Sequence, residues 1–502
     1  MLTQKEYRSR VLGCWMGKNI GGTLGAPFEW HRQVNNVEFY TQDLGGEPMP
    51  NDDLDIQLLW LIMLEEQGLD VNSATMADYW MQFVTPHWAE YGNSKVNMRA
   101  GIQPPYSGIR NNYFKHSCGA WIRSEIWACI APGRPDLAAR FAYEDASIDH
   151  GDGEGTYAAM FCAALESAAF VEKDIAKLID IGLSYIPEDC GTAGAIKCAM
   201  DSHKNGLTWL DARHKILENY RGNVFYGSMD HISKDDVDRG FTDGEPGWDA
   251  PSNIGILIIG LLYGGKDFSQ TMCITVNCGE DTDCTGATIG ALYGILYGIE
   301  SIPEKWITPI GRSIKTITLN LGDLGYFGDM VPRDIDNLTN RTEAIMCKMA
   351  AIHGLPVEVA APKPVPVGEL YANKNSLSYV NTTAVRRRFP FFDVALEYVN
   401  GVSVKPGESA KLKLTIANRY RIQAGLTVKC YTPDYYGWQV QPAQEFKTFI
   451  GVTGHDCSKT IDMEFSYSDR DTPPASSRFV IEITVDGRAE VMLVPVVLVV
   501  DC

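Results

Sequence analysis

The sequence predicts a two-domain protein in which a helical domain precedes a β-sandwich. Its 502 residues exceed the roughly 250–300 residues that one hydrophobic core usually serves. Helical periodicity dominates residues 1–355, whereas short alternating apolar segments occupy residues 379–502. Between them, the proline-rich segment 356–378 is expected to form a stiff linker.

The first predicted helix, residues 7–25, carries a stripe of small residues on one face. Glycine recurs at every fourth position, at Gly13, Gly17, Gly21 and Gly25. Each interior glycine costs about 0.5–1 kcal/mol relative to alanine, so this helix needs a closely packed neighbour. Pro27 is expected to end the helix and to leave Glu29 at its mouth.

A second helix is predicted to begin after Asn51, which is a good N-cap residue. Its first turn contains Asp52, Asp53 and Asp55. Acidic residues are common in first turns because the helix dipole stabilises each by about 0.3–1 kcal/mol. A structural role therefore explains this motif as well as a catalytic one does.

Three polar segments farther along the chain are candidate parts of a pocket. The loop predicted at 92–119 is a candidate cover. His150, in the turn 147–155, either faces a ligand or belongs to an ordinary glycine-rich turn. Trp248, in the long acidic loop 226–253, offers a stacking surface for a ring or plugs the core.

The most concentrated chemistry lies in the turn 279–285, which contains Glu280, Asp281 and Asp283. A second glycine-striped helix follows, with Gly286, Gly290, Gly294 and Gly298. Two helices with bare glycine faces are natural partners because their backbones approach closely. Such packing would hold the acidic turn rigidly.

If these helices pair, Asp52, Asp53, Asp281 and Asp283 converge, with Glu29 beside them. Two carboxylates about 5 Å apart at an effective dielectric of about 20 repel by on the order of 3 kcal/mol. The cluster therefore requires cations or protons. Oxygen ligands favour Mg²⁺, Mn²⁺ or Ca²⁺, and two such ions could orient a substrate hydroxyl pair and activate a water.

The pattern changes near the C-terminus to short apolar or alternating strands. The clearest segments are 410–416, 426–431, 479–485 and 491–500. Such repetition is typical of a β-sandwich. The arginine run 386–388 ahead of them is expected to be solvated surface, and residues 305–354 upstream are expected to be helical.

Composition excludes several classes of function. The net charge of −19 disfavours nonspecific binding of nucleic acid and of anionic membranes. The longest apolar runs, 254–263 and 491–500, are too short to span a bilayer. Thirteen cysteines without a CxxC pair indicate reduced thiols. With no apolar signal core at the start of the chain, we expect a cytoplasmic protein.

Several motifs occur in one order, and together they make residues 7–350 resemble the ADP-ribosylglycohydrolase superfamily. They are the glycine helix through Glu29, Asn51-Asp52-Asp53, His150-Gly151, and Gly279-Glu280-Asp281-Thr282-Asp283 with its glycine-rich helix. The resemblance implies an all-α fold and a centre of two Mg²⁺ or Mn²⁺ ions. It also implies hydrolysis at the anomeric carbon of a ribose whose adjacent hydroxyls face the metals.

The same resemblance implies roles for individual residues. The implied metal ligands are Asn51, Asp52, Asp53, Asp281, Asp283 and Cys284. The implied catalytic residues are Glu29, Asp53 and Asp281, where Glu29 is either a ligand or the acid/base near the scissile bond. The implied substrate-binding residues are Gly119, Arg123, His150, Trp248, Asn253, Gly279 and Glu280.

The chain departs from the superfamily pattern in its candidate ligands. Asn51 and Cys284 stand where the superfamily usually has threonine, Thr23 lies in the region of a usual aspartate, and Cys118 stands where asparagine is common. A thiol suits hard ions badly. Thr285, the neighbour of Cys284, offers an alternative oxygen.

The C-terminal segments resemble immunoglobulin-like domains appended to some carbohydrate-active enzymes. We therefore predict a metal-dependent glycoside hydrolase that cleaves an N- or O-glycosidic bond of ADP-ribose or a related ribosyl substrate. One alternative is a glycosidase for a carbohydrate or nucleoside, and another is a catalytically silent sugar- or ADP-ribose-binding protein. The expected partner is a small-molecule glycoside or an ADP-ribosylated substrate.

Overall fold

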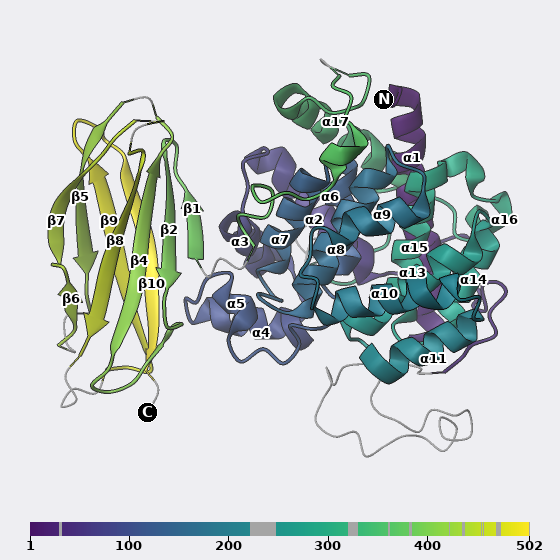
Figure 1. Cartoon of the computed structure of the whole chain (residues 1–502), viewed down its shortest axis with the longest axis horizontal. Helices are drawn as coiled ribbons and strands as arrows, with labels where there is room; N and C mark the ends of the chain where they lie inside the picture. Colours follow the sequence, from purple (N-terminus) through teal and green to yellow (C-terminus); the bar gives the residue numbers. More distant parts are fainter. Residues whose placement is uncertain are drawn as a thin grey trace.

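The computed structural model of the chain has a helical region beside a β region, which confirms the predicted fold class (Figure 1). The structure describes residues 1–29, 33–220, 247–319, 330–359, 362–380, 384–420, 422–433, 437–452, 454, 456–467 and 473–500. Among these residues, no helix combines the length and apolar character that crossing a membrane requires.

The helical region is built from elements of very different length. Its α-helices are α1 (Gln4–Gly25), α2 (Asp52–Gln67), α3 (Ser73–Phe83), α4 (Ala89–Arg99), α5 (Tyr106–Ile109), α6 (Glu125–Ile130), α7 (Pro135–Ala146), α8 (Glu154–Ala169), α9 (Ile175–Leu183), α10 (Gly191–Lys204), α11 (Trp209–Tyr220), α13 (Ala250–Gly264), α14 (Phe268–Asn277), α15 (Thr282–Tyr297), α16 (Glu304–Ile307) and α17 (Ile335–His353). Short 3₁₀ turns are η1 (Ala26–Phe28), η2 (Trp121–Arg123), η3 (Ile299–Ser301) and η5 (Val367–Leu370).

Helices α1 and α15 pack along their glycine stripes, as the sequence predicts. A Cβ atom at Gly17 would lie 2.0 Å from the carbonyl oxygen of Gly290, and one at Gly21 would lie 1.9 Å from that of Gly286. The backbones are therefore in direct contact. Any side chain at these positions would force the helices apart.

Two segments of the helical region differ from the sequence prediction. Helix α4 occupies part of the predicted loop 92–119. Within it, a Cβ placed at Gly92 would lie 2.3 Å from the carbonyl oxygen of His87. Residues 308–319 are irregular rather than helical. Asp55 accepts hydrogen bonds from the backbone of this irregular segment, including Thr318 N–H at 2.7 Å.

The segment predicted to be a stiff linker is attached to the helical region. Leu355, Val357, Leu370 and Tyr379 are buried in the helical core. The first strand begins only at Ala384, so the helical unit extends beyond residue 355. Apolar side chains placed between the prolines explain this difference. Their burial against the helical core stabilises the attached segment relative to a free linker.

The β region consists of two five-stranded sheets, which form a sandwich. Its strands are β1 (Ala384–Arg388), β2 (Phe392–Tyr398), β3 (Ser403–Val404), β4 (Ser409–Asn418), β5 (Ala424–Tyr431), β6 (Gln439–Gln441), β7 (Glu445–Ile450), β8 (Ser458–Ser466), β9 (Ser476–Val485) and β10 (Val491–Val500). One sheet has the order β1-β2-β4-β8-β6 and the other β3-β10-β9-β5-β7. The four strands predicted from sequence are confirmed as β4, β5, β9 and β10.

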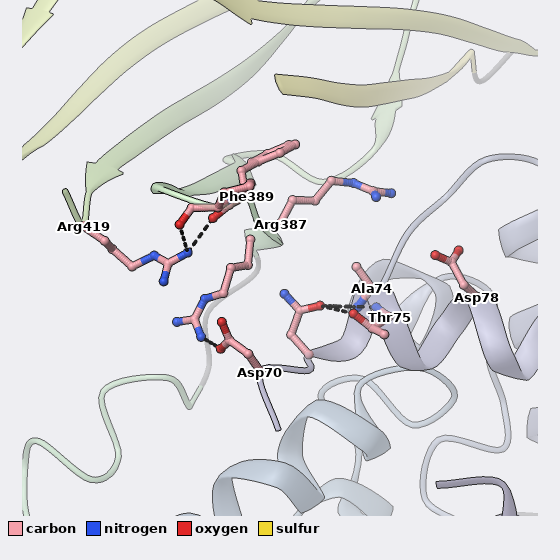
Figure 2. A pocket seen from close by; sticks show the side chains of 10 residues that line it. Asp70, Ala74, Thr75, Asp78, Arg387, Phe389 and Arg419 are labelled. Atoms are coloured by element: carbon pink, nitrogen blue, oxygen red, sulfur yellow. Dashed lines mark hydrogen bonds and ion pairs between the residues drawn. The ribbon is translucent and has the colours of Figure 1, made fainter. Parts of the chain in front are cut away.

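The two regions meet at β1, where the expectation of a solvated arginine run is confirmed for the exposed Arg388 and is wrong for the half-buried Arg386 and Arg387. Arg386 forms an ion pair with Glu144 of α7 at 2.9 Å, and Arg387 donates to Gln103 at 3.1 Å. A cavity of about 330 Å³ lies at this junction (Figure 2). Asp70 and Asp78 line it from the helical side. The run lies on an edge strand beside acidic helices, which sequence spacing alone does not reveal.

Candidate metal centre

The acidic turns at the starts of α2 and α15 meet at one end of the glycine-paired helices. Ligand atoms of Asp53, Asp283 and Cys284 all lie within 4.8 Å of one another. A second group with the same spacing contains Glu29, Asp281 and Asp283. Asp283 belongs to both groups and therefore joins them into one centre.

Local backbone contacts hold the two turns in place. Asn51 caps α2, since its Oδ1 accepts the Asp53 N–H at 2.7 Å. Thr282 Oγ1 donates to the carbonyl of Gly25 at 2.9 Å, which ties the end of α1 to the start of α15. This link also brings Glu29, four residues past Gly25, to the centre.

The acidic turn itself has an unusual backbone. Gly279 has φ +71°, and a Cβ there would lie 2.1 Å from the carbonyl oxygen of Gln33. Glu280 has φ +66° and is fully buried. Asn253 Oδ1 accepts the Asp281 N–H at 3.1 Å. These contacts fix the direction in which Asp281 and Asp283 project.

The carboxylates of the centre are buried and mutually repelling. Asp53 is 1% exposed, Asp281 4% and Asp283 6%. Burial raises the pKa of all three well above the ordinary aspartate value, and charge repulsion among them raises it further. Burial also raises the pKa of the half-buried Asp52. Without a bound cation, these groups therefore hold a proton more readily than an exposed aspartate does.

The orphaned oxygens provide a test of whether a divalent cation fits. Both carboxylate oxygens of Asp53, Oδ1 of Asp281 and Oδ1 of Asp283 are buried without a hydrogen-bond partner among the described residues. Buried charged oxygens without donors are rare unless they bind metals. Because carboxylate oxygens suit divalent ions, the residues fit a divalent cation.

Comparison with known proteins identifies the family. The model of the ADP-ribosylglycohydrolase family matches residues 3–333. The chain belongs to the ADP-ribosylglycohydrolase family. Members of this family are typically hydrolases with a binuclear metal site, with which the acidic centre is consistent.

Solved structures give weaker likenesses. A chain from a structure titled "ADP-ribosylglycohydrolase-related protein complex" is 19% identical, with a TM-score of 0.42, over 68% of this chain and 99% of that one. A chain from a structure titled "AvmM Catalyzes Macrocyclization in Alchivemycin A Biosynthesis" is 11% identical, with a TM-score of 0.14, over 23% and 95%. A comparison with curated proteins finds no match.

In this family member, Asn51 differs from the other implied ligands because its side chain directs an amide nitrogen, not an oxygen, toward the centre. Its oxygen already accepts the Asp53 N–H, and its Nδ2 lies 3.5 Å from Asp283 Oδ2. Gly22 makes room for it, because a Cβ there would lie 2.2 Å from this nitrogen. The side chain thus offers Asp283 a donor.

Lys18 is a buried cation beside the centre that sequence reasoning missed. Its Nζ lies 3.5 Å from Asp53 Oδ1 and 2.7 Å from Glu125 Oε1, and the residue is 1% exposed. Burial lowers its pKa, but Glu125 and Asp53 outweigh burial and raise it above the ordinary value. The available signal was its position between Gly17 and Gly21, on a helix that had to be buried.

Arg123 and His150, both implied substrate contacts, are engaged inside the protein. Arg123 is fully buried and forms ion pairs at 2.8 Å with Asp145 and Asp149. His150 Nδ1 lies 2.9 Å from Asp149 Oδ1, and its Nε2 lies 3.1 Å from Ser117 Oγ. Both side chains are therefore occupied by contacts within the helical region.

The other implied substrate residues have mixed surroundings. At Gly119, a Cβ would lie 2.0 Å from Glu90 Oε1, so the glycine permits a close approach. Asn253 holds the acidic turn and also donates to the carbonyl of Gly247 at 2.8 Å. Trp248 is half-buried. Residues 226–246 of the predicted loop lie outside the described residues.

Proposed function

We propose that the chain is a metal-dependent glycoside hydrolase that cleaves an N- or O-glycosidic bond of ADP-ribose or a related ribosyl substrate. The observation that carries the proposal is the convergence of Glu29, Asp53, Asp281 and Asp283 with orphaned carboxylate oxygens. Burying such a set of carboxylates costs free energy, and bound cations would offset that cost. Membership of the family supports the same class of reaction.

The roles follow from burial and position. Asp53, Asp281 and Asp283 would hold two divalent ions, and Asp52 would complete the set. Bound ions of this kind orient substrate hydroxyls and lower the pKa of water. Glu29 is half-buried, so it is the carboxylate of the set best placed to exchange a proton between solvent and the scissile bond.

The test is hydrolysis of ADP-ribosyl-arginine, ADP-ribosyl-serine, nucleosides and a panel of aryl glycosides, each with Mg²⁺, Mn²⁺ or EDTA. We expect turnover of an ADP-ribosyl substrate that EDTA abolishes. Asp53→Asn and Asp283→Asn should each lower kcat/KM by at least about 100-fold. Asp336→Asn, an exposed residue paired with Arg312, is the matched control and should retain activity.

Two other outcomes would redirect the assignment. Turnover limited to aryl glycosides or nucleosides would keep the metal chemistry and change the substrate class. Complete inactivity with tight binding of ADP-ribose would indicate a silent binding protein, which the Asn51 amide nitrogen facing Asp283 favours. Unchanged metal content in Asp53→Asn and Asp283→Asn would show that the centre is not the metal site.

A further inference from the structure

Cys284 presents sulfur to the acidic centre. The residue lies in the first turn of α15 and is 7% exposed. Its Sγ belongs to the group in which Asp53 and Asp283 contribute oxygens, all within 4.8 Å. Both Asp53 oxygens and Oδ1 of Asp283 are buried and lack hydrogen-bond partners among the described residues. The sulfur therefore stands beside oxygens that require a cation.

The neighbouring hydroxyl does not replace the sulfur. Thr285 Oγ1 donates to the carbonyl of Asp281 at 2.9 Å and lies 3.4 Å from that of Thr282. Its hydroxyl thus bonds to its own helix. Thr282 Oγ1 is likewise used, by the carbonyl of Gly25. Cys284, and neither threonine, is consequently the side chain that joins Asp53 and Asp283 in their ligand group.

A second thiol provides an internal comparison. Cys118 is 3% exposed, and Cys284 is 7% exposed. Cys118 belongs to neither group of candidate ligands, whereas Cys284 does. The two cysteines share burial and differ in whether the sulfur belongs to a group of candidate ligands.

Sulfur changes which ions a site prefers. Carboxylate oxygens alone suit Mg²⁺, whereas a thiolate ligand favours Zn²⁺, Co²⁺ and similar ions over Mg²⁺. We propose that Cys284 is a metal ligand and makes this a mixed sulfur–oxygen centre that takes a thiophilic divalent ion at the Asp53–Asp283 position. The inference deepens the proposed metal-dependent function and rests on it.

The binding step is balanced without a redox partner. The S–H bond of Cys284 breaks, a sulfur–metal bond forms from the same electron pair, and one proton leaves to solvent. No oxidation state changes. The natural chain should therefore release one more proton on binding Co²⁺ or Zn²⁺ than Cys284→Ser does, a difference that calorimetry in buffers of different ionisation enthalpy detects.

The experiment uses Co²⁺ alone as the probe of the reduced full chain under nitrogen. Thiolate ligation gives an intense near-ultraviolet sulfur-to-cobalt charge-transfer band, which a site made only of oxygen lacks. We expect the band in the natural chain and in Cys118→Ser, and its loss in Cys284→Ser. Cys284→Ser should also lower the ratio of Cd²⁺ to Mg²⁺ affinity by at least about tenfold.

The outcomes separate this inference from the proposed function. Calorimetric Co²⁺ binding without the band would overturn the sulfur ligand and leave the metal centre intact. A band that survives Cys284→Ser and disappears in Cys118→Ser would show that Cys118, not Cys284, is the sulfur ligand. Absence of Co²⁺, Mg²⁺ and Mn²⁺ binding would overturn both proposals. Circular dichroism of each variant checks that its fold is retained.

Discussion

Two groups of buried aspartates in the helical region differ in how their charge is balanced. Asp145 and Asp149 surround the guanidinium of Arg123. Asp281 and Asp283 form no ion pair within the described residues, and their oxygens remain partly orphaned. The first group carries its cation as a side chain, whereas the second is built to receive one.

The pKa values express the same contrast at Asp149 and Asp283, whereas burial outweighs Arg123 at Asp145 and raises its pKa to about 6. Burial raises the pKa of Asp149, but Arg123 and His150 outweigh burial and lower it to about 2. Burial raises the pKa of Asp283 well above its usual value, and Glu29, Asp53 and Asp52 raise it further. Equal burial therefore produces a fixed anion in one place and a readily protonated group in the other, according to the neighbouring charge.

Removing the internal cation should have the largest effect. Arg123→Met leaves Asp145 and Asp149 buried without their partner, so we expect the free energy of unfolding to fall by about 3–5 kcal/mol. Urea unfolding with excess EDTA measures it. Arg312→Met removes the partner of Asp336 from an exposed pair and should cost at most about 1 kcal/mol. Equal losses of unfolding free energy in Arg123→Met and Arg312→Met would show that the buried aspartates do not depend on Arg123 more than an exposed pair depends on its arginine.

Removing one acid from the other group should act in the opposite direction. Asp283→Asn relieves repulsion at the centre, and at mildly alkaline pH the metal-free protein should gain about 1–2 kcal/mol. The variant should also lose the stabilisation that Mn²⁺ gives the natural chain. Thermal unfolding with EDTA and with Mn²⁺ measures both changes. Destabilisation in EDTA would show that Asp283 serves the fold directly.

Lys18 is an intermediate case, since it is a protein cation that touches only the edge of the centre. Lys18→Met removes a positive charge near Asp53 and should tighten Mg²⁺ binding about tenfold, or about 1.4 kcal/mol. Glu125→Gln removes a negative charge beside Lys18, so the positive charge of Lys18 is less neutralised and should weaken Mg²⁺ binding. Isothermal titration calorimetry measures both, and weaker binding in both variants would indicate that Lys18 acts only as a packing residue.

The smallest expected effect is a pH dependence of the metal-free protein. The folded pKa values of Asp53, Asp281 and Asp283 lie above the unfolded value of about 4. Their contribution to stability is therefore complete below about pH 4 and is lost as pH rises through the folded values. With EDTA, the free energy of unfolding should therefore fall as pH rises above about 4, and Tm should fall with it. Saturating Mn²⁺ should flatten this slope, and a Tm that rises with pH in EDTA would contradict the assignment.

The sequence predicts the parts of the centre that depend on local spacing. Gly17 and Gly290 are recognisable because a fourfold glycine repeat has few uses other than close helix packing. Asn51 is recognisable as a cap. Partners that are distant in sequence cannot be recognised in this way. Lys18, for example, pairs with Glu125, which lies 107 residues away along the chain. The ion pair between Arg386 and Glu144 cannot be predicted from sequence for the same reason, since it forms only across the junction of the helical and β regions.

The contact between Gly17 and Gly290 has a consequence for ion selection. It joins the two helices through peptide groups alone, so no rotamer change adjusts the distance between the acidic turns. The backbone therefore limits the radius of the ion that the centre can hold. Single substitutions can still change the charge and softness of the ligands. Variants of this centre should therefore exchange one ion for another of similar size more easily than they accept a larger one.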